Sequence, residues 1–214
     1  MNEQNPHSGQ PIVEAGTPLE TAEAALVLVH GRGATARSIT QFGRQVHQEG
    51  VALLAPQAAG NEWYPESFLA PIEANEPGRR SGLQAIEAAV KRARNVGIPF
   101  ERIMLAGFSQ GACLVSEYVA SNPRRYGGLA VLSGGLLGEV VEPGDYDGDL
   151  AGTPVFLGCS DVDPHIPAER VRATEAVFES LNAGVDRRLY EGMAHTVNGD
   201  ELDAVGSLVE RLVD

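Results

Sequence analysis

The sequence is short of cysteine and lysine, and it has no long hydrophobic run. Its two cysteines, Cys113 and Cys159, both lie in apolar stretches, so a disulfide framework is disfavoured and a reducing compartment is favoured. No apolar run approaches the roughly 20 residues that a membrane-spanning helix needs. Residues 1–6 lack the basic and apolar regions of a secretory signal. We therefore expect a cytoplasmic protein that does not insert into a membrane.

Positive charge is scarce as well. Of 214 residues, 16 are basic and 29 are acidic, Lys91 is the single lysine, and the formal net charge is −13. Such a chain repels phosphate backbones and anionic lipid, so nucleic acid and membranes are disfavoured as partners. Two interpretations of this composition stay open. One is a halophilic protein whose carboxylates are screened by molar salt, and the other is an ordinary acidic protein from a high-GC genome.

Apolar residues make up 43% of the sequence, which is enough for one sizeable core. Apolar runs of strand length alternate with helical patterns, as is typical of an α/β protein with a mostly parallel central sheet and helices on both faces. We predict one such domain over residues 11–214, after a flexible segment over residues 1–10. The predicted strands are 11–15, 24–29, 51–55, 102–106, 129–132, 154–157 and 187–190, and helical spacing occurs over 39–46, 83–93, 110–120, 171–181 and 202–212.

A nucleophile motif lies between a predicted strand and a predicted helix. Residues 107–111 are Gly-Phe-Ser-Gln-Gly, which matches the G-x-S-x-G pattern of a strained strand-to-helix turn. Side chains two residues to either side of the serine would clash in such a turn, so glycine is needed at both positions. The turn exposes the hydroxyl at the carboxyl end of the sheet, where open α/β sheets bind ligands. We therefore predict Ser109 as the nucleophile.

A serine hydroxyl needs a base that takes its proton and an acid that orients the base. In this motif class the acid and the base follow the serine in that order along the chain. His195 stands between the last predicted strand and the last predicted helix, so we predict it as the base. Asp161 and Asp163 both follow the strand over 154–157, and spacing alone does not choose between them. The unused carboxylate is expected in a turn or cap.

Acyl transfer also needs two backbone N–H groups that bind the tetrahedral oxyanion. The Gln110 amide directly after the nucleophile is the first predicted donor. The strand over 24–29 leads into His30-Gly31-Arg32-Gly33, and the Arg32 amide is the second. His30 itself is expected to be structural. In the long irregular segment over 56–80, we predict that an apolar wall of Trp63, Tyr64, Phe68 and Leu69 stands beside the mouth of the site.

Together, these motifs resemble the α/β-hydrolase superfamily and, within it, the phospholipase/carboxylesterase family that includes acyl-protein thioesterases. The similarity lies in residues 28–33, 107–111, 163–167 (Asp-Pro-His-Ile-Pro) and 190–195 (Tyr-Glu-Gly-Met-Ala-His). The resemblance implies an α/β-hydrolase fold over roughly residues 24–213, Asp163 as the catalytic acid, and no metal or cofactor. It is compatible with a homodimer, because related enzymes are often dimers.

Two features depart from that family pattern. Arg32 stands where the family often has an apolar residue, which would put a guanidinium at the edge of an acyl site. Residues 63–71 resemble a microbial branch, which argues against protein depalmitoylation.

We therefore predict a serine carboxylesterase for short- to medium-chain esters of small molecules, because residues 133–152 are too few for a large lid domain. A thioesterase or lysophospholipase with the same triad is the alternative. A metal-dependent hydrolase using His30, His165, His195 and the carboxylates of residues 161–163 is less favoured, because the spacing matches no compact metal motif. A non-catalytic ligand-binding protein on a hydrolase scaffold is a distant alternative.

Overall fold

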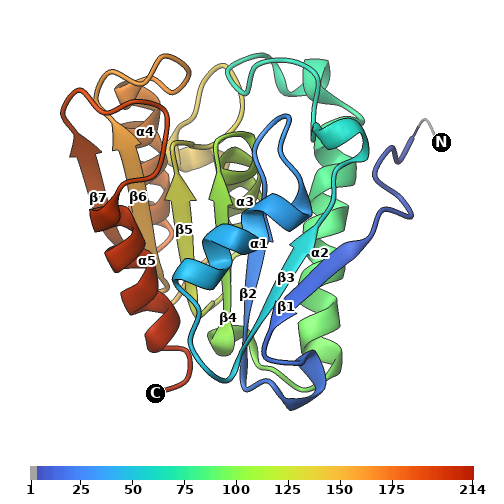
Figure 1. Ribbon diagram of the computed structural model, residues 1–214. Helices are drawn as coiled ribbons and strands as arrows, with labels where there is room; N and C mark the ends of the chain where they lie inside the picture. Colours follow the sequence, from blue (N-terminus) through green and yellow to red (C-terminus); the bar gives the residue numbers. More distant parts are fainter. Residues whose placement is uncertain (1–3) are drawn as a thin grey trace.

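The computed structural model describes residues 4–214. Its centre is a seven-stranded sheet in the order β1-β3-β2-β4-β5-β6-β7, with helices on both faces (Figure 1). The strands are β1 (Ile12–Gly16), β2 (Ala24–Val29), β3 (Val51–Pro56), β4 (Ile103–Phe108), β5 (Gly128–Leu132), β6 (Pro154–Ser160) and β7 (Gly184–Tyr190). β1 runs antiparallel to β3, and the other five pairings are parallel. The mostly parallel sheet expected from the sequence is confirmed.

Five α-helices and several short 3₁₀ turns connect the strands. The helices are α1 (Ala36–Gln45), α2 (Gly78–Asn95), α3 (Gln110–Ser121), α4 (Ala168–Ser180) and α5 (Gly199–Glu210). The 3₁₀ turns are η1 (Leu19–Thr21), η2 (Ala59–Asn61), η3 (Ile72–Asn75), η4 (Phe100–Arg102) and η5 (Pro143–Asp145). Figure 1 shows α1 and α5 in front of the sheet and α2, α3 and α4 behind it.

Each central strand is buried on both faces because successive side chains point to opposite sides of a sheet. In β2, Val27 and Val29 pack into the cluster that contains α2, α3 and α4. Leu26 and Leu28 pack into the cluster that contains α1 and α5. This two-sided burial is why the strand is a continuous apolar run instead of an alternating one.

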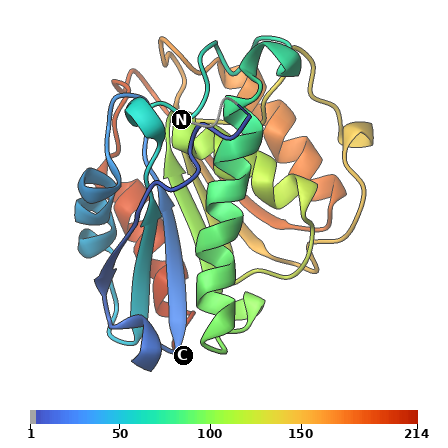
Figure 2. The ribbon, with the colours of Figure 1, turned by 90° about the vertical axis from the view of Figure 1, so that its right-hand side faces the viewer.

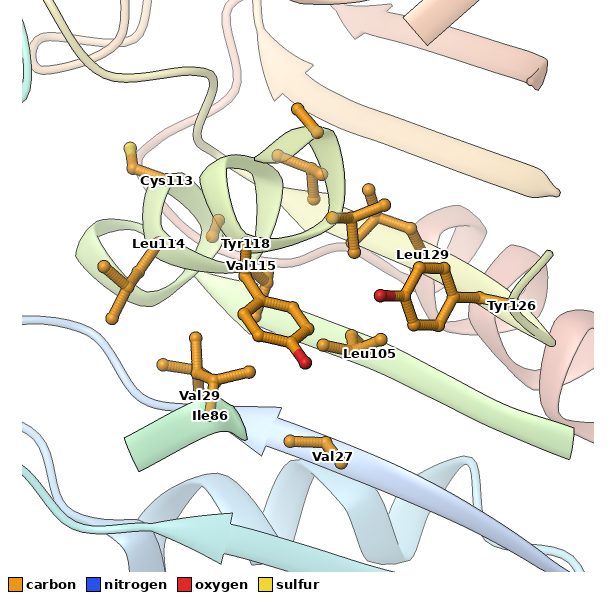
Figure 3. Close-up of a cluster of buried hydrophobic side chains, with 14 of the residues drawn as sticks. Val27, Val29, Ile86, Leu105, Cys113, Leu114, Val115, Tyr118, Tyr126 and Leu129 are labelled. Atoms are coloured by element: carbon orange, nitrogen blue, oxygen red, sulfur yellow. The ribbon is translucent and has the colours of Figure 1, made fainter. Parts of the chain in front are cut away.

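Helix α3 lies at the centre of the larger cluster. All of its residues from Gln110 to Ala120 are buried, which fits the nearly all-apolar sequence of this segment. Figure 3 shows Leu114 and Tyr118 of α3 together with Ile86 of α2 and Leu105 of β4. The residue just before α3 therefore adjoins a helix that is buried along nearly its whole length.

The described part of the N-terminal segment contacts the rest of the domain. That residues 1–10 are flexible stays a prediction; Asn5 and His7 make hydrogen bonds to α2, and residues 1–3 lie outside the described residues. The Asn5 amide donates to Gln84 Oε1 of α2 at 2.8 Å, and the His7 backbone N–H donates to Ser81 Oγ at 2.9 Å. The His7 side chain is buried, and Figure 2 shows this segment beside α2. These contacts with α2 are hydrogen bonds, which the hydrophobic pattern of a sequence does not record.

Cys113 and Cys159 are both free and buried. Within residues 4–214, every helix is too short or too polar to cross a bilayer.

Candidate active site

Ser109 occupies a strained turn between β4 and α3. Its backbone has φ of 54° and ψ of −120°, a conformation that residues other than glycine rarely adopt. A Cβ atom at Gly107 would clash with the backbone of Gly111, and one at Gly111 would clash with the carbonyl of Val29. The Ser109 N–H donates to the carbonyl of Leu132 at 2.9 Å. The two glycines therefore permit the turn, and the neighbouring strand β5 holds it.

Three side chains from three loops meet at this turn. His195, in the loop between β7 and α5, has Nε2 at 2.9 Å from Ser109 Oγ. On its other side, His195 Nδ1 lies 2.7 Å from Oδ2 of Asp163, in the loop after β6. The structure thus brings Ser109, His195 and Asp163 into one hydrogen-bonded series. Such a series can move a proton from the hydroxyl to the imidazole while the carboxylate stabilises the imidazolium.

The two candidate acids have different surroundings. Asp163 Oδ1 accepts hydrogen bonds from the backbone N–H groups of His165 and Ile166, which orients Oδ2 toward the imidazole. Asp161 instead accepts the backbone N–H of Gly192 at 2.9 Å. It therefore links the loop after β6 to the loop that carries His195. Sequence spacing does not distinguish the two carboxylates, but in the structure it is Asp163 that lies within hydrogen-bond distance of His195.

The environment of Asp163 favours its charged form. Desolvation by burial raises the pKa of this carboxyl, but the hydrogen bond with His195 and those from the backbone outweigh it. The net pKa lies below its ordinary value. Asp163 is therefore ionised wherever an imidazole base would work, and it can hold one tautomer of His195.

A tight turn places a free amide beside the serine. Ala34 N–H donates to the carbonyl of Gly31 at 3.1 Å, and Gly33, with φ of 77°, donates its N–H to the carbonyl of Asn61 at 2.8 Å. Within residues 4–214, the Arg32 amide of this turn has no protein acceptor. A Cβ atom at Gly31 would touch Ser109 Cβ at 3.4 Å, so the turn packs directly on Ser109. Gln110 is the first residue of α3, where N–H groups have no acceptor within the helix.

A cavity of about 570 Å³ opens over the serine. Its lining includes Ser109, His195, Arg32, Tyr64 and Phe68. A second cavity of about 630 Å³, lined by Glu117 and Tyr146 among others, contains no serine paired with a histidine. The first cavity is therefore the candidate substrate site, and its size is typical of small-molecule sites.

Two residues of the predicted wall do not line this cavity. Trp63 is fully buried, and its indole N–H donates to the carbonyl of His30 at 2.8 Å. Leu69 is only partly exposed and packs against the hydrophobic core. The apolar wall thus consists of Tyr64 and Phe68. The prediction that Trp63 forms part of the wall is wrong, because nothing in the local sequence shows that its N–H has a buried acceptor.

His30 is structural, as expected from the sequence. It is fully buried, its Nδ1 donates to the carbonyl of Gly31 at 2.8 Å, and its Nε2 accepts the N–H of Ala58 at 3.2 Å. Burial lowers the pKa of this imidazole, which fits the neutral form that these two bonds require. Its ring packs against Trp63 at a centroid distance of 4.9 Å. His30 therefore supports the 30–34 turn from beneath.

Four further residues shape the cavity and were not singled out for it from the sequence. Phe108 and His165 each place a ring centroid 5.0 Å from that of His195. Cys113 and Ile166 also line the cavity. Cys113 follows Ser109 by one helical turn, so helical spacing was a usable signal for it. The other three lie inside the quoted motifs, where only coordinates show their orientation.

Among the residues from 4 to 214, no three His, Cys, Asp or Glu side chains are grouped closely enough to hold an ion. His165 and His195 are neighbours, whereas His30 lies beneath the 30–34 turn and bonds to Gly31 and Ala58.

Comparisons with known proteins give a consistent result. The family model described as Phospholipase/Carboxylesterase matches residues 10–212. Two curated relatives are acyl-protein thioesterase 1 of Saccharomyces cerevisiae, 32% identical over 70% of this chain, and that of Kluyveromyces lactis, 33% identical over 58%. The chain spans 65% and 56% of the lengths of these two proteins, less than two thirds in both cases.

A solved structure extends the similarity over nearly the whole chain. The crystal structure of a phospholipase/carboxylesterase from Dyadobacter fermentans superposes with a TM-score of 0.89 at 40% identity, and the match covers 94% of this chain and 97% of that one. The fold is therefore that of the α/β hydrolases, without a large additional domain.

Proposed function

The chain belongs to the phospholipase/carboxylesterase family of hydrolases, and we propose that it is a serine carboxylesterase for short- to medium-chain esters. One observation carries this proposal. It is the series Ser109 Oγ, His195 and Asp163, joined at 2.9 and 2.7 Å on the floor of a cavity.

The proposed reaction has two halves. His195 takes the proton of Ser109 as its oxygen attacks the ester carbonyl, and the amides of Arg32 and Gln110 stabilise the oxyanion. His195 then protonates the leaving alkoxide, which leaves an acyl-enzyme on Ser109. Water, activated by the same imidazole, hydrolyses that intermediate and returns the hydroxyl. Asp163 stabilises the imidazolium in both halves.

The proposed preference for shorter acyl chains follows from the shape of the cavity. Tyr64, Phe68 and Ile166, which line the cavity, supply apolar contact area. The cavity remains open to solvent, because residues 133–153 form an irregular connection with only one short 3₁₀ turn. Methylenes that extend beyond these walls gain little burial.

A thioesterase with the same triad is the second candidate, and the names of the yeast relatives favour it. Thiols have a pKa near 8.5, so a thiolate leaves without the proton that an alkoxide needs. An oxyester specialist therefore depends on His195 as a general acid more than a thioesterase does. Comparing kcat/KM for an oxyester and a thioester of the same acyl group separates the two.

The test is hydrolysis of p-nitrophenyl esters, acyl-CoA thioesters and lysophospholipids by the wild type and by Ser109→Ala. We expect the wild type to favour the oxyesters and Ser109→Ala to lower kcat by about 10⁴- to 10⁶-fold. Ser116→Ala is the matched control, because Ser116 lies on α3, which begins just after Ser109, and its hydroxyl donates to the carbonyl of Ala112. Activity that survives in Ser109→Ala would contradict the proposal.

A further inference from the structure

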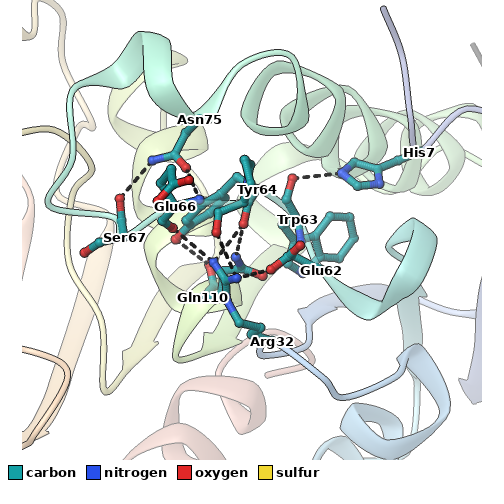
Figure 4. A network of polar contacts seen from close by, with 10 residues as sticks. His7, Arg32, Glu62, Trp63, Tyr64, Glu66, Ser67, Asn75 and Gln110 are labelled. Atoms are coloured by element: carbon teal, nitrogen blue, oxygen red, sulfur yellow. Dashed lines mark hydrogen bonds and ion pairs between the residues drawn. The ribbon is translucent and has the colours of Figure 1, made fainter. Parts of the chain in front are cut away.

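The Arg32 side chain makes an unusual set of contacts at the edge of the cavity. Its Nη1 donates to the carboxylate of Glu62 and to the carbonyl of Pro65 at 3.0 Å. Its Nη2 donates to the carbonyls of Tyr64, at 2.8 Å, and Glu66, at 3.0 Å. Figure 4 shows the guanidinium among the residues of this segment. Three consecutive backbone carbonyls are therefore gathered by one side chain.

These contacts leave little of the guanidinium for a substrate. The two terminal nitrogens carry four N–H groups, and four acceptors occupy them. Glu62 also offsets the positive charge. Arg32 is therefore poorly suited to bind an anionic group of a substrate, and its planar fork serves to fix geometry.

The backbone of Arg32 belongs to the turn next to Ser109. Arg32 lies in the turn that packs on Ser109, and its N–H has no acceptor within residues 4–214. Because the side chain and this N–H share one Cα atom, the segment that holds the guanidinium also restricts the direction of the N–H.

The other oxyanion donor is tied to the same place. Gln110 Nε2 donates to the carbonyl of Tyr64 at 2.8 Å, and Gln110 Oε1 accepts the N–H of Trp63 at 2.9 Å. The carbonyl of Tyr64 thus accepts from both Arg32 and Gln110. These are the two residues whose amides we assign to the oxyanion.

The segment itself has independent anchors. Asn75 Oδ1 accepts the N–H of Glu66 at 2.9 Å, and Asn75 Nδ2 donates to the carbonyl of Ser67 at 2.9 Å. Asn75 is fully buried, so it is a fixed point beneath the cavity wall. Loss of the Arg32 side chain should therefore loosen the 31–34 turn without unfolding the 62–67 segment.

We propose that Arg32 is a positioning residue whose guanidinium, together with the Gln110 side chain, sets the spacing of the two oxyanion donors through the carbonyl of Tyr64. This inference rests on the proposed function, because it assigns the two amides to an oxyanion. The same segment supplies Tyr64 and Phe68 to the acyl wall. We call the contacts of Arg32 and Gln110 with the carbonyl of Tyr64 the tether. The tether therefore links stabilisation of the oxyanion to the shape of the acyl site.

The test compares Arg32→Met, which keeps a stem of similar length without the fork, with Arg32→Lys. We expect Arg32→Met to lower kcat by about 10- to 100-fold with KM changed by less than about threefold, because the donor is displaced and not deleted. Arg32→Lys should lie between Arg32→Met and the wild type, because one ammonium cannot replace the fork. The control is Arg37→Met, since Arg37 is exposed on α1 and its side chain has no partner among the described residues.

A second measurement separates positioning from a loss of folding. Phenylboronic acid forms a tetrahedral adduct with a nucleophilic serine, so its inhibition constant reports on the oxyanion site. It should rise in Arg32→Met by about the factor that kcat falls, while the melting temperature of Arg32→Met stays close to that of the wild type. Arg37→Met should keep the wild-type melting temperature and activity. An Arg32→Met variant within threefold of the wild type in both kcat and boronate inhibition would overturn the proposal.

The tether can also be tested without any activity. Amide hydrogen exchange at Gly33 and Ala34, whose N–H groups donate to Asn61 and Gly31, should be faster in Arg32→Met than in the wild type, because the 31–34 turn loses its side-chain link to the 62–66 segment. Exchange at Glu66, whose N–H donates to Asn75, should change little. If the wild type hydrolyses no ester or thioester, the proposed function fails, and exchange alone then decides the tether. Unchanged exchange at Gly33 and Ala34 would overturn it, and faster exchange there would support it.

Discussion

A buried carboxyl behind the active site makes the stability of this protein depend on pH. Glu201, in the first turn of α5, is fully buried. Its Oε2 accepts the N–H of Asn198 at 2.8 Å, whereas Oε1 has no hydrogen-bond partner among the described residues. Burial raises the pKa of Glu201 from 4.5 to about 7, against the opposing hydrogen bond from Asn198.

The sign follows from proton binding in the two states. Between pH 4.5 and 7 the folded protein keeps a proton on Glu201 that the unfolded chain has released, so stability falls as pH rises through this window. A difference of about 2.5 pKa units corresponds to about 3 kcal/mol in the free energy of unfolding. Glu201→Gln retains an oxygen acceptor for Asn198 and cannot ionise, so it should remove this loss.

The assay is urea unfolding of the wild type and Glu201→Gln between pH 4.5 and 8. His7 and His30 also have pKa values lowered by burial, and they make stability rise with pH as the unfolded histidines lose their protons. Their contribution cancels in the difference between wild type and variant, so that difference is the quantity to plot. It should shift by about 3 kcal/mol in favour of the variant as pH rises. Parallel profiles would refute the reasoning, and Glu210→Gln, at an exposed position of the same helix, should give them.

Three other outcomes are expected. Asp163→Asn should lower kcat by about 10⁴-fold because His195 loses its orienting acceptor, whereas Asp161→Asn should lower kcat by less than about tenfold. Steady-state kinetics with p-nitrophenyl acetate measure both effects, and the reverse order would contradict the assignment of Asp163. Across p-nitrophenyl esters, kcat/KM should be highest at short acyl chains, and a maximum at twelve or more carbons would contradict an open, shallow site. If the net charge of −13 reflects a high-salt habitat, the melting temperature should rise between dilute buffer and molar KCl, and a flat or falling response would remove that hypothesis.

Much of the fold could be predicted because its strands are buried on both faces. The runs at 24–29, 51–55 and 129–132 are continuous apolar segments, and they match β2, β3 and β5 within one residue at either end. The C-terminal end of β6 and the N-terminal end of β7 each extend three residues beyond the expected strands, to Ser160 and back to Gly184. Apart from Val185, the residues at those ends are polar or small, and they pair through backbone hydrogen bonds that a hydrophobic pattern does not record.

The sequence predicts which residue types of the candidate site could carry the chemistry, but it does not predict how their side chains are oriented. The loop after β6 was identified, but the choice between Asp161 and Asp163 depends on which carboxylate faces His195, and spacing does not contain that direction. Trp63 was misplaced because a large aromatic residue near a cavity suggests a wall, although a buried carbonyl binds its N–H. Arg32 was noted as a departure from the family pattern, but its contacts with the 62–66 segment are long-range and appear only in the structure.

The central claim is that Ser109 is a nucleophile activated by His195, and covalent labelling tests it most directly. Wild-type protein treated with a fluorophosphonate should gain the mass of one adduct, and peptide mapping should locate it on Ser109. His195→Ala should slow the labelling by several orders of magnitude. An unlabelled wild type, an adduct on another residue, or labelling at the wild-type rate in His195→Ala would contradict the account.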